Sequence, residues 1–134
     1  MSFVLDTSIA CNWALKDEAH PTALQAFERA HTDAICVPVL WWFEIRNALV
    51  MNERRKRLTE SETRQFLGEV RLLAINIDHT PDETKVLALA RQYKLTVYDA
   101  AYLELALREG VPLATLDHKL ALAARAEKVQ LIGQ

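Results

Sequence analysis

Residues 2–9 read Ser2-Phe3-Val4-Leu5-Asp6-Thr7-Ser8-Ile9, a short apolar run that ends at one carboxylate and two hydroxyls. A run this short and this apolar is typical of a strand that is covered on both faces of a parallel sheet. Ligands of such sheets bind outside the carboxyl ends of the strands, where a following side chain points into the crevice. The stretch therefore predicts the fold class and makes Asp6 the first candidate site residue.

Similar short runs recur along the chain, with helical patterns between them. The predicted strands cover residues 3–5, 35–37, 75–77, 112–114 and 130–132. Strands that alternate with helices indicate a parallel sheet with helices on both faces. We expect an α/β three-layer sandwich, with a central parallel sheet of about five short strands flanked by helices. No linker-like stretch interrupts residues 1–134, so a single domain is expected.

Several helix boundaries are marked by local signals. Residues 59–62 read Thr-Glu-Ser-Glu, a capping box, and residues 80–83 read Thr-Pro-Asp-Glu, a second box with proline at the first helical position. Gly110 is well placed to end the helix that begins near Asp99. A last helix is expected over residues 121–128. Between residues 39 and 74, two helices follow each other without an evident strand between them.

Composition places the chain among ordinary globular proteins. Of its 134 residues, 51% are hydrophobic and 25% charged, and the formal net charge is −2. This charge argues against uniform electrostatic coating of nucleic acid, but it leaves room for a local basic patch. Cys11 and Cys36 lack metal-binding or redox spacing, and neither a signal-peptide pattern nor a membrane-length apolar run is present. We expect a cytoplasmic protein that does not insert into membranes.

Three further acids stand in apolar settings like that of Asp6. Glu44 interrupts the apolar stretch 38–43, Asp99 opens a helical pattern, and Asp117 follows the apolar run 111–116. Carboxylates in such settings are costly unless they are compensated, and four around one crevice need a counter-charge. Oxygen-only ligands select hard cations, so Mg²⁺ or Mn²⁺ is indicated.

Each acid also has a simpler interpretation. Asp6 and Asp117 can cap the helices that follow them, and Asp99 fits the third helical position of a box that starts at Thr96. Glu44 can face solvent. However, Glu44 and Asn47 share one helix face, which suits a carboxylate ligand supported by an amide.

Taken together, these motifs resemble those of PIN-domain ribonucleases, and among them the VapC toxins of bacterial toxin–antitoxin pairs. The resemblance spans essentially the whole chain and rests on Val4-Leu5-Asp6-Thr7-Ser8-Ile9, residues 38–49 around Glu44, residues 95–106 around Asp99, and Leu113-Ala114-Thr115-Leu116-Asp117.

The resemblance implies a Mg²⁺- or Mn²⁺-dependent endoribonuclease that hydrolyses RNA phosphodiester bonds and inhibits translation as a toxin. The implied catalytic metal ligands are Asp6, Glu44, Asp99 and Asp117, with Ser8 and Thr115 as supporting hydroxyls and Asn47 as a supporting amide. It also implies a homodimer and a cognate antitoxin protein as partner. A PIN nuclease that processes RNA without being a toxin is the alternative within the same family.

An acidic site repels RNA, so positive charge is needed nearby. Residues 46–57 hold five basic side chains against Glu53, a local charge of 5 − 1 = +4. The candidate RNA-contacting residues are Arg46, Arg54, Arg55, Lys56 and Arg57. A solvated loop between two helices explains the run equally well. Trp41 and Trp42 suit core or dimer packing better than base stacking, and Tyr98 is the better candidate for a substrate contact.

A protein of another class also gathers acids at a sheet edge: the receiver-like regulatory module, which is phosphorylated on an aspartate. Such a module requires an acidic pair after the first strand and an aspartate after the third. Here the first strand is followed by Asp6 alone, and the sequence Ile-Asn-Ile-Asp over residues 75–78 matches only in part. A haloacid-dehalogenase-like phosphatase would need a second aspartate where Ser8 stands.

Overall fold

The computed structural model describes residues 1–133. Its elements follow in the order β1 (Ser2–Leu5), α1 (Thr7–Ala14), the 3₁₀ turn η1 (Lys16–Glu18), α2 (Pro21–Ala30), β2 (Ala34–Pro38), α3 (Leu40–Arg54), α4 (Glu60–Val70), β3 (Ile75–Asp78), α5 (Glu83–Tyr93), α6 (Val97–Glu109), β4 (Leu113–Ala114) and α7 (His118–Ala126).

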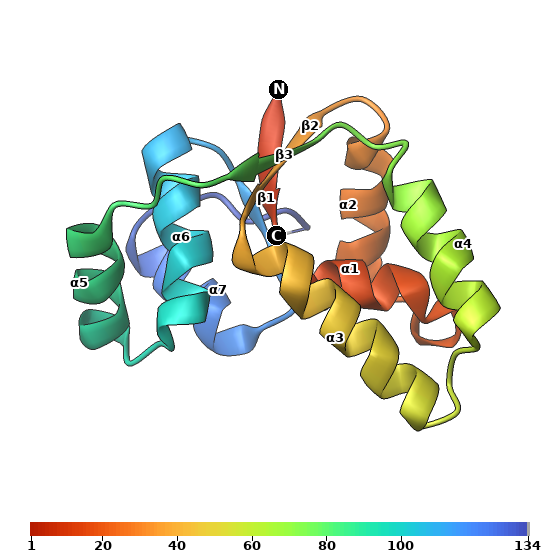
Figure 1. Ribbon diagram of the computed structural model, residues 1–134. Helices are drawn as coiled ribbons and strands as arrows, with labels where there is room; N and C mark the ends of the chain where they lie inside the picture. Colours follow the sequence, from red (N-terminus) through yellow and green to blue (C-terminus); the bar gives the residue numbers. More distant parts are fainter. Residues whose placement is uncertain (134) are drawn as a thin grey trace.

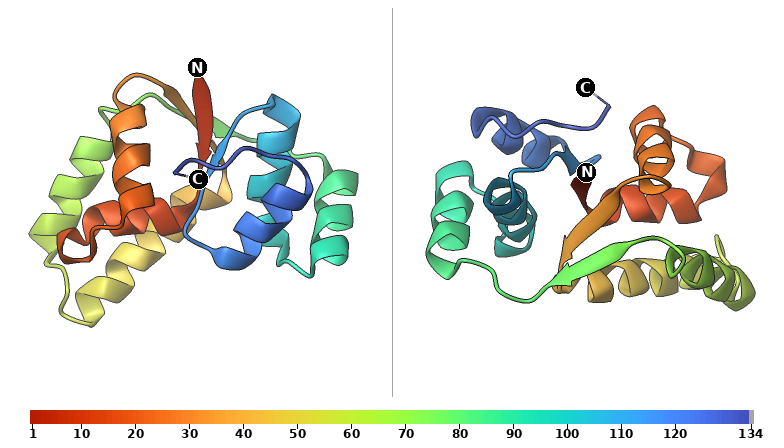
Figure 2. Two further views of the ribbon diagram at one scale, coloured as in Figure 1. Left: turned by 180° about the vertical axis from the view of Figure 1, so that it is seen from behind. Right: turned by 90° about the horizontal axis from the view of Figure 1, so that it is seen from above.

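The helices cover both faces of one parallel sheet, as the alternation of strands and helices predicts. Figure 1 shows α1 to α4 on one side of the strands and α5 to α7 on the other, and the view from above in Figure 2 shows the same division. Helix α6 contacts β1, β2 and β4, while α3 contacts β2 and α2 contacts β4. The predicted α/β three-layer sandwich is confirmed.

The sheet has four strands within residues 1–133, in the order β3-β2-β1-β4. All three pairings are parallel, with Val4 of β1 opposite Cys36 of β2 and Leu113 of β4. The receiver-like alternative requires the order 2-1-3-4-5, so this topology excludes it. The chain passes from β1 through β2 to β3 on one side and then returns to place β4 on the other side of β1.

The strand prediction is wrong at residues 130–132. There the chain forms a single bridge, between Leu131 and Leu113, and no strand. Strand β4 itself has only two residues, so it offers little backbone for a further strand to pair with. The sheet therefore has four strands where about five were expected.

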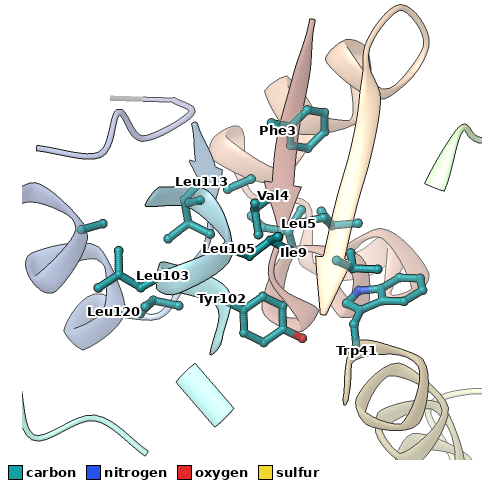
Figure 3. Close-up of a cluster of buried hydrophobic side chains, with 14 of the residues drawn as sticks. Phe3, Val4, Leu5, Ile9, Trp41, Tyr102, Leu103, Leu105, Leu113 and Leu120 are labelled. Atoms are coloured by element: carbon teal, nitrogen blue, oxygen red, sulfur yellow. The ribbon is translucent and has the colours of Figure 1, made fainter. Parts of the chain in front are cut away.

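The central strand β1 forms the middle of the core. Phe3, Val4 and Leu5 are completely buried, and Figure 3 shows them among side chains that come from both helical layers. The edge strand β3 differs from the prediction that every strand is covered on both faces. Its Ile77 is 37% exposed, and β3 is the edge strand of the sheet described here.

The helix boundaries agree with the predictions at two of four places. Thr59 caps α4 in a complete capping box with Glu62, and Gly110 ends α6 in the left-handed conformation. Helix α5 is capped by Asp82 and begins at Glu83, so the box predicted from Thr80 is wrong. The Thr80 hydroxyl donates to Asp78 instead.

The last helix, α7, begins three residues earlier than predicted, because Asp117 caps it. Nowhere in the described part of the chain is a helix long and apolar enough to cross a membrane.

Candidate functional site

The topology places the carboxyl ends of β1 and β4 side by side at one end of the sheet. The chain leaves β1 in one direction toward β2 and returns on the other side at β4, which makes this the switch point of the sheet. Asp6 follows β1 directly, and its backbone N–H donates to the carbonyl of Ala114 at 3.0 Å. Asp117 lies three residues beyond the end of β4, so the two carboxylates share this edge.

Asp6 is the most buried of the four predicted acids, with 6% of its surface exposed. Its Oδ2 accepts hydrogen bonds from the hydroxyls of Ser8 and Thr115, both at 2.7 Å. The structure thus brings both predicted supporting hydroxyls to Asp6. Although Asp6 precedes α1, its side chain does not cap that helix, so the simpler interpretation of this residue does not apply.

The same two hydroxyls also fix the loop after β4. Ser8 Oγ accepts from the backbone N–H of Leu116 at 2.9 Å, and Thr115 Oγ1 accepts from that of Asp117 at 2.9 Å. Two loops that are far apart in sequence are therefore held together around the carboxylate of Asp6.

Glu44 lies on α3 and reaches the site through two residues that were not predicted. Its Oε1 accepts hydrogen bonds from the Thr7 hydroxyl at 3.0 Å and from the Tyr102 hydroxyl at 2.5 Å. The sequence contains a signal for each, since Thr7 follows Asp6 directly and Tyr102 lies one helical turn after Asp99. Asn47 is exposed, and within residues 1–133 it forms no hydrogen bond to Glu44.

Asp99 lies in the first turn of a helix, in agreement with the helical pattern predicted to open there. It is the third residue of α6, and its backbone N–H donates to the Thr96 hydroxyl that caps the helix. Asp117 does cap a helix, because its Oδ1 accepts from the backbone N–H of Leu120 at 2.9 Å. One oxygen of Asp117 is therefore occupied by α7.

Burial and the charges of neighbouring acids raise the pKa values of Asp6 and Asp99. Burial is the main cause of the raised pKa of Asp6, and the charges of Glu44 and Asp117 add to it. Burial also raises the pKa of Asp99, followed by the charges of Asp117 and Asp6. The four predicted acids therefore lie close enough to act on one another electrostatically. A cation bound among them would stabilise their negative charge.

Tyr102 keeps its proton in this setting. Its ring is completely buried, and Figure 3 shows it near the carboxyl end of β1. Burial, followed by the hydrogen bond to Glu44, raises the pKa of its hydroxyl well above the ordinary value of 10.0. It therefore acts as a hydrogen-bond donor to the carboxylate at neutral pH.

The donor set fits a hard divalent cation in its chemistry, since it consists of carboxylate and hydroxyl oxygens. The acids do not surround a metal position closely: among residues 1–133, no three acidic, histidine or cysteine side chains are close enough together to enclose an ion. Burial opposes the ionisation of Asp6 and Asp99. A bound cation would therefore stabilise the charged form of these two acids the most.

The predicted basic residues lie away from these acids. Arg54 is ten residues beyond Glu44 on α3, which corresponds to ~15 Å along the helix. Arg57 forms ion pairs with Glu18 at 2.9 Å and Asp17 at 3.5 Å. It lines, together with Lys56, a cavity of about 500 Å³.

Arg46 stacks over the Trp42 ring at 3.8 Å, on a different side of α3 from Glu44. A nearer cation is Lys119, in the first turn of α7, whose charge lowers the pKa of Asp99.

The three aromatic candidates have different surroundings. Trp41 is 4% exposed and belongs to the core, while Trp42 is 42% exposed beside Phe43. Tyr98 is 64% exposed on the first turn of α6, next to Asp99. Of the three, Tyr98 is both accessible and adjacent to the acids.

Comparison with known proteins shows the family of the chain. The profile of the PIN domain family matches residues 3–126. Ribonuclease VapC3 from Pyrobaculum aerophilum is 32% identical over 127 residues, which cover 90% of this chain and 93% of that protein.

Three solved structures share the fold. The crystal structure of PAE2754 from Pyrobaculum aerophilum superposes with a TM-score of 0.70 at 23% identity, covering 92% of this chain and 87% of that one. VapBC2 from Rickettsia felis, bound to a DNA fragment from its promoter, gives a TM-score of 0.64 at 17% identity, with 98% and 97% covered. A toxin–antitoxin complex from Klebsiella pneumoniae gives 0.53 at 23% identity, with 82% of each chain covered.

Proposed function

This chain belongs to the PIN domain family, and from that premise we propose that it is a metal-dependent endoribonuclease that hydrolyses RNA phosphodiester bonds. The observation that carries the proposal is the buried Asp6 carboxylate, which shares its surroundings with the charges of Glu44, Asp99 and Asp117. Mg²⁺ or Mn²⁺ is the ion that such an oxygen-only set favours. The ribonuclease named among the relatives supports the same assignment.

The residues of the site would divide the work as follows. Asp6 and Asp99 would bind the cation directly, because they are the two acids whose ionisation is opposed by burial. Ser8 and Thr115 hold Oδ2 of Asp6 and leave Oδ1 for the ion. Glu44 and Asp117 would complete the negative set. When bound, the cation lowers the pKa of a water molecule and stabilises negative charge on the phosphate.

The biological role proposed is that of a toxin in a type II toxin–antitoxin system, which inhibits translation by cutting RNA in the cytoplasm. Two solved structures of the same fold come from toxin–antitoxin systems, which supports a cognate antitoxin as the protein partner. The sequence pI of about 6.1 suits an antitoxin with a basic segment. A homodimer is proposed on the family resemblance.

The activity is tested with purified protein and a mixed pool of transfer and ribosomal RNA. The wild type is expected to cut at discrete positions with Mg²⁺ or Mn²⁺ and to stop cutting in EDTA. Asp6→Asn and Asp99→Asn should each abolish the cuts, because each removes one carboxylate charge from the proposed metal site. Asp33→Asn is the matched control, since Asp33 pairs with Arg29 outside this site.

Cutting that persists in EDTA or in both site variants would overturn the assignment. The toxin role has its own readout, which is expression of the chain in a bacterial host. Wild-type expression should arrest growth and amino-acid incorporation, and Asp6→Asn should do neither. Nuclease activity without growth arrest would favour the alternative of an RNA-processing PIN nuclease that is not a toxin.

A further inference from the structure

The side-chain oxygen Oε1 of Glu44 is held by hydroxyls from two other helices. Thr7 on α1 and Tyr102 on α6 both lie within hydrogen-bond distance of it, and their own oxygens are 2.8 Å apart. Each hydroxyl has one proton to donate. Either both hydroxyls donate to Oε1, or one donates to Oε1 and the other donates to the first hydroxyl. Either way, the hydrogen bonds to Glu44 are made on its Oε1 side.

Asp6 is held in the same way. Its Oδ2 accepts hydrogen bonds from two hydroxyls, and Oε1 of Glu44 likewise has two hydroxyls within hydrogen-bond distance. Within residues 1–133, neither the second oxygen of Asp6 nor that of Glu44 accepts a hydrogen bond from the protein. In both carboxylates, therefore, one oxygen is held by hydroxyl groups and the other is available to a ligand.

The chemistry of the donors matters, because hydroxyls orient a carboxylate without cancelling its charge. Glu104, two residues beyond Tyr102 on α6, shows the contrast. It is 2% exposed, and Arg108 donates to its two oxygens at 2.7 and 3.1 Å, which neutralises it. No ion pair of this kind is formed by Glu44 among the residues described, so its hydrogen-bond partners at Oε1 are both uncharged hydroxyls.

We propose that Thr7 and Tyr102 are positioning residues that fix Oε1 of Glu44 and present Oε2 to a divalent cation. The proposal rests on the function proposed above, and it adds two residues to the site. Hydrogen-bond partners of metal ligands typically affect metal affinity by 10- to 100-fold. Because the Tyr102 ring is completely buried, it is held by the core and transmits that rigidity to the carboxylate.

The test measures Mn²⁺ affinity by electron paramagnetic resonance, without RNA. Tyr102→Phe and Thr7→Val each remove a hydroxyl and keep the volume of the side chain. Each is expected to weaken Mn²⁺ binding by about 10-fold. Thr7→Ser, which keeps the hydroxyl, should bind like the wild type. Circular dichroism and thermal melting establish that each variant is folded.

Two matched controls remove the same groups elsewhere. Tyr93→Phe deletes a tyrosine hydroxyl that donates to Glu127, on another part of the surface. Thr63→Val deletes a buried hydroxyl that has no partner among the described residues. Both controls should leave Mn²⁺ affinity unchanged. A second readout is RNA cleavage, where excess Mn²⁺ should restore Tyr102→Phe, a rescue that a purely structural defect would not show.

The outcomes separate the two levels of the proposal. If Glu44→Gln weakens Mn²⁺ binding while folded Tyr102→Phe and Thr7→Val do not, the positioning role is overturned and the metal site stands. If Glu44→Gln binds Mn²⁺ as tightly as the wild type, the positioning role is overturned and the metal site rests on Asp6 and Asp99. If the wild type binds no Mn²⁺, both the metal site and the positioning role are overturned.

Discussion

The carboxylate of Asp6 stands in surroundings that oppose its own charge. It is 6% exposed, and its pKa is raised by burial and by the acids around it. A carboxyl group whose pKa is raised by folding binds its proton more tightly in the folded protein than in the unfolded chain. Folding stability therefore falls as the pH rises from the ordinary pKa of 3.8 through the raised value.

Replacing Asp6 by asparagine should therefore stabilise the metal-free protein at neutral pH. We expect Asp6→Asn in EDTA to raise Tm by about 2–5 °C at pH 7, and by less at pH 4.5, where the wild-type carboxyl is closer to protonation. Thermal melts at the two pH values measure this difference. Saturating Mg²⁺ should raise Tm of the wild type and not that of the variant.

An Asp6→Asn protein that is less stable than the wild type at pH 7 in EDTA would contradict this. It would mean that the two hydroxyl hydrogen bonds to Asp6 outweigh the penalty of burying its charge.

The sequence allowed the charged members of the site to be predicted, but not the hydroxyls that hold Glu44. Asp6 and Glu44 stand out because a carboxylate inside an apolar stretch is rare without a purpose. Thr7 and Tyr102 stand close to Asp6 and Asp99 in the sequence, but their local sequence gives no sign of a contact with Glu44. Their roles arise only when α1, α3 and α6 pack together, since hydrogen bonds across 37 and 58 residues depend on tertiary structure.

At the scale of the elements, predictions held where the signal is local. Thr59 and Gly110 act through hydrogen bonds or backbone angles within one turn, so both were found correctly. The start of α5 was missed, because the Thr80 side chain turns to Asp78 at the end of β3. Residues 130–132 have the composition of a strand, but they meet only the end of the two-residue strand β4.

Two helix ends with the same backbone conformation give a matched prediction. Gly110 ends α6 at φ 65°, and Lys94 ends α5 at φ 55°, both in the left-handed region. A side chain is strained there by roughly 1 kcal/mol. We expect Gly110→Ala to lower the free energy of unfolding by about 1 kcal/mol and Lys94→Gly to raise it by about 0.5–1 kcal/mol. Urea denaturation measures both.

Gly68 supplies the control, because replacing this glycine by alanine is expected to stabilise the protein, whereas Gly110→Ala is expected to destabilise it. It lies inside α4, and a Cβ there would meet nothing within 4 Å, as at Gly110. Gly68→Ala should therefore stabilise the protein by about 0.5–1 kcal/mol. If Gly110→Ala were also stabilising, the left-handed turn at the end of α6 would not be the conformation in solution.

Across the whole molecule, the strand order decides where the acids meet. Because β4 returns to the far side of β1, the loops after these two strands lie at the same end of the sheet, and α3 and α6 belong to opposite helical layers (Figure 1). The alternating pattern predicted the layers. The position of the basic run relative to the acids required the structure, which places Arg54 at the far end of α3, ten residues beyond Glu44.

The separation of the basic run 54–57 from the acids leads to a prediction about how RNA is bound. Arg54 and Arg55 form no ion pair within the described residues, unlike Arg57. We propose that they contact phosphates remote from the cut. In an Asp6→Asn background, which prevents cleavage, Arg54→Glu with Arg55→Glu should weaken RNA binding. It should also reduce the slope of log K against log salt by about 1.4, since each phosphate contact to single-stranded RNA contributes about 0.7.

The control makes the same change of charge on the opposite side of the molecule. Arg91→Glu with Lys94→Glu alters α5, which Figure 1 shows across the sheet from the end of α3. Non-specific attraction to net charge would weaken RNA binding equally in both double variants, because each changes the net charge by four units. A larger effect at Arg54 and Arg55 assigns the RNA path to the far end of α3. Equal effects would leave Lys119, whose charge already acts on Asp99, as the cation that meets the substrate.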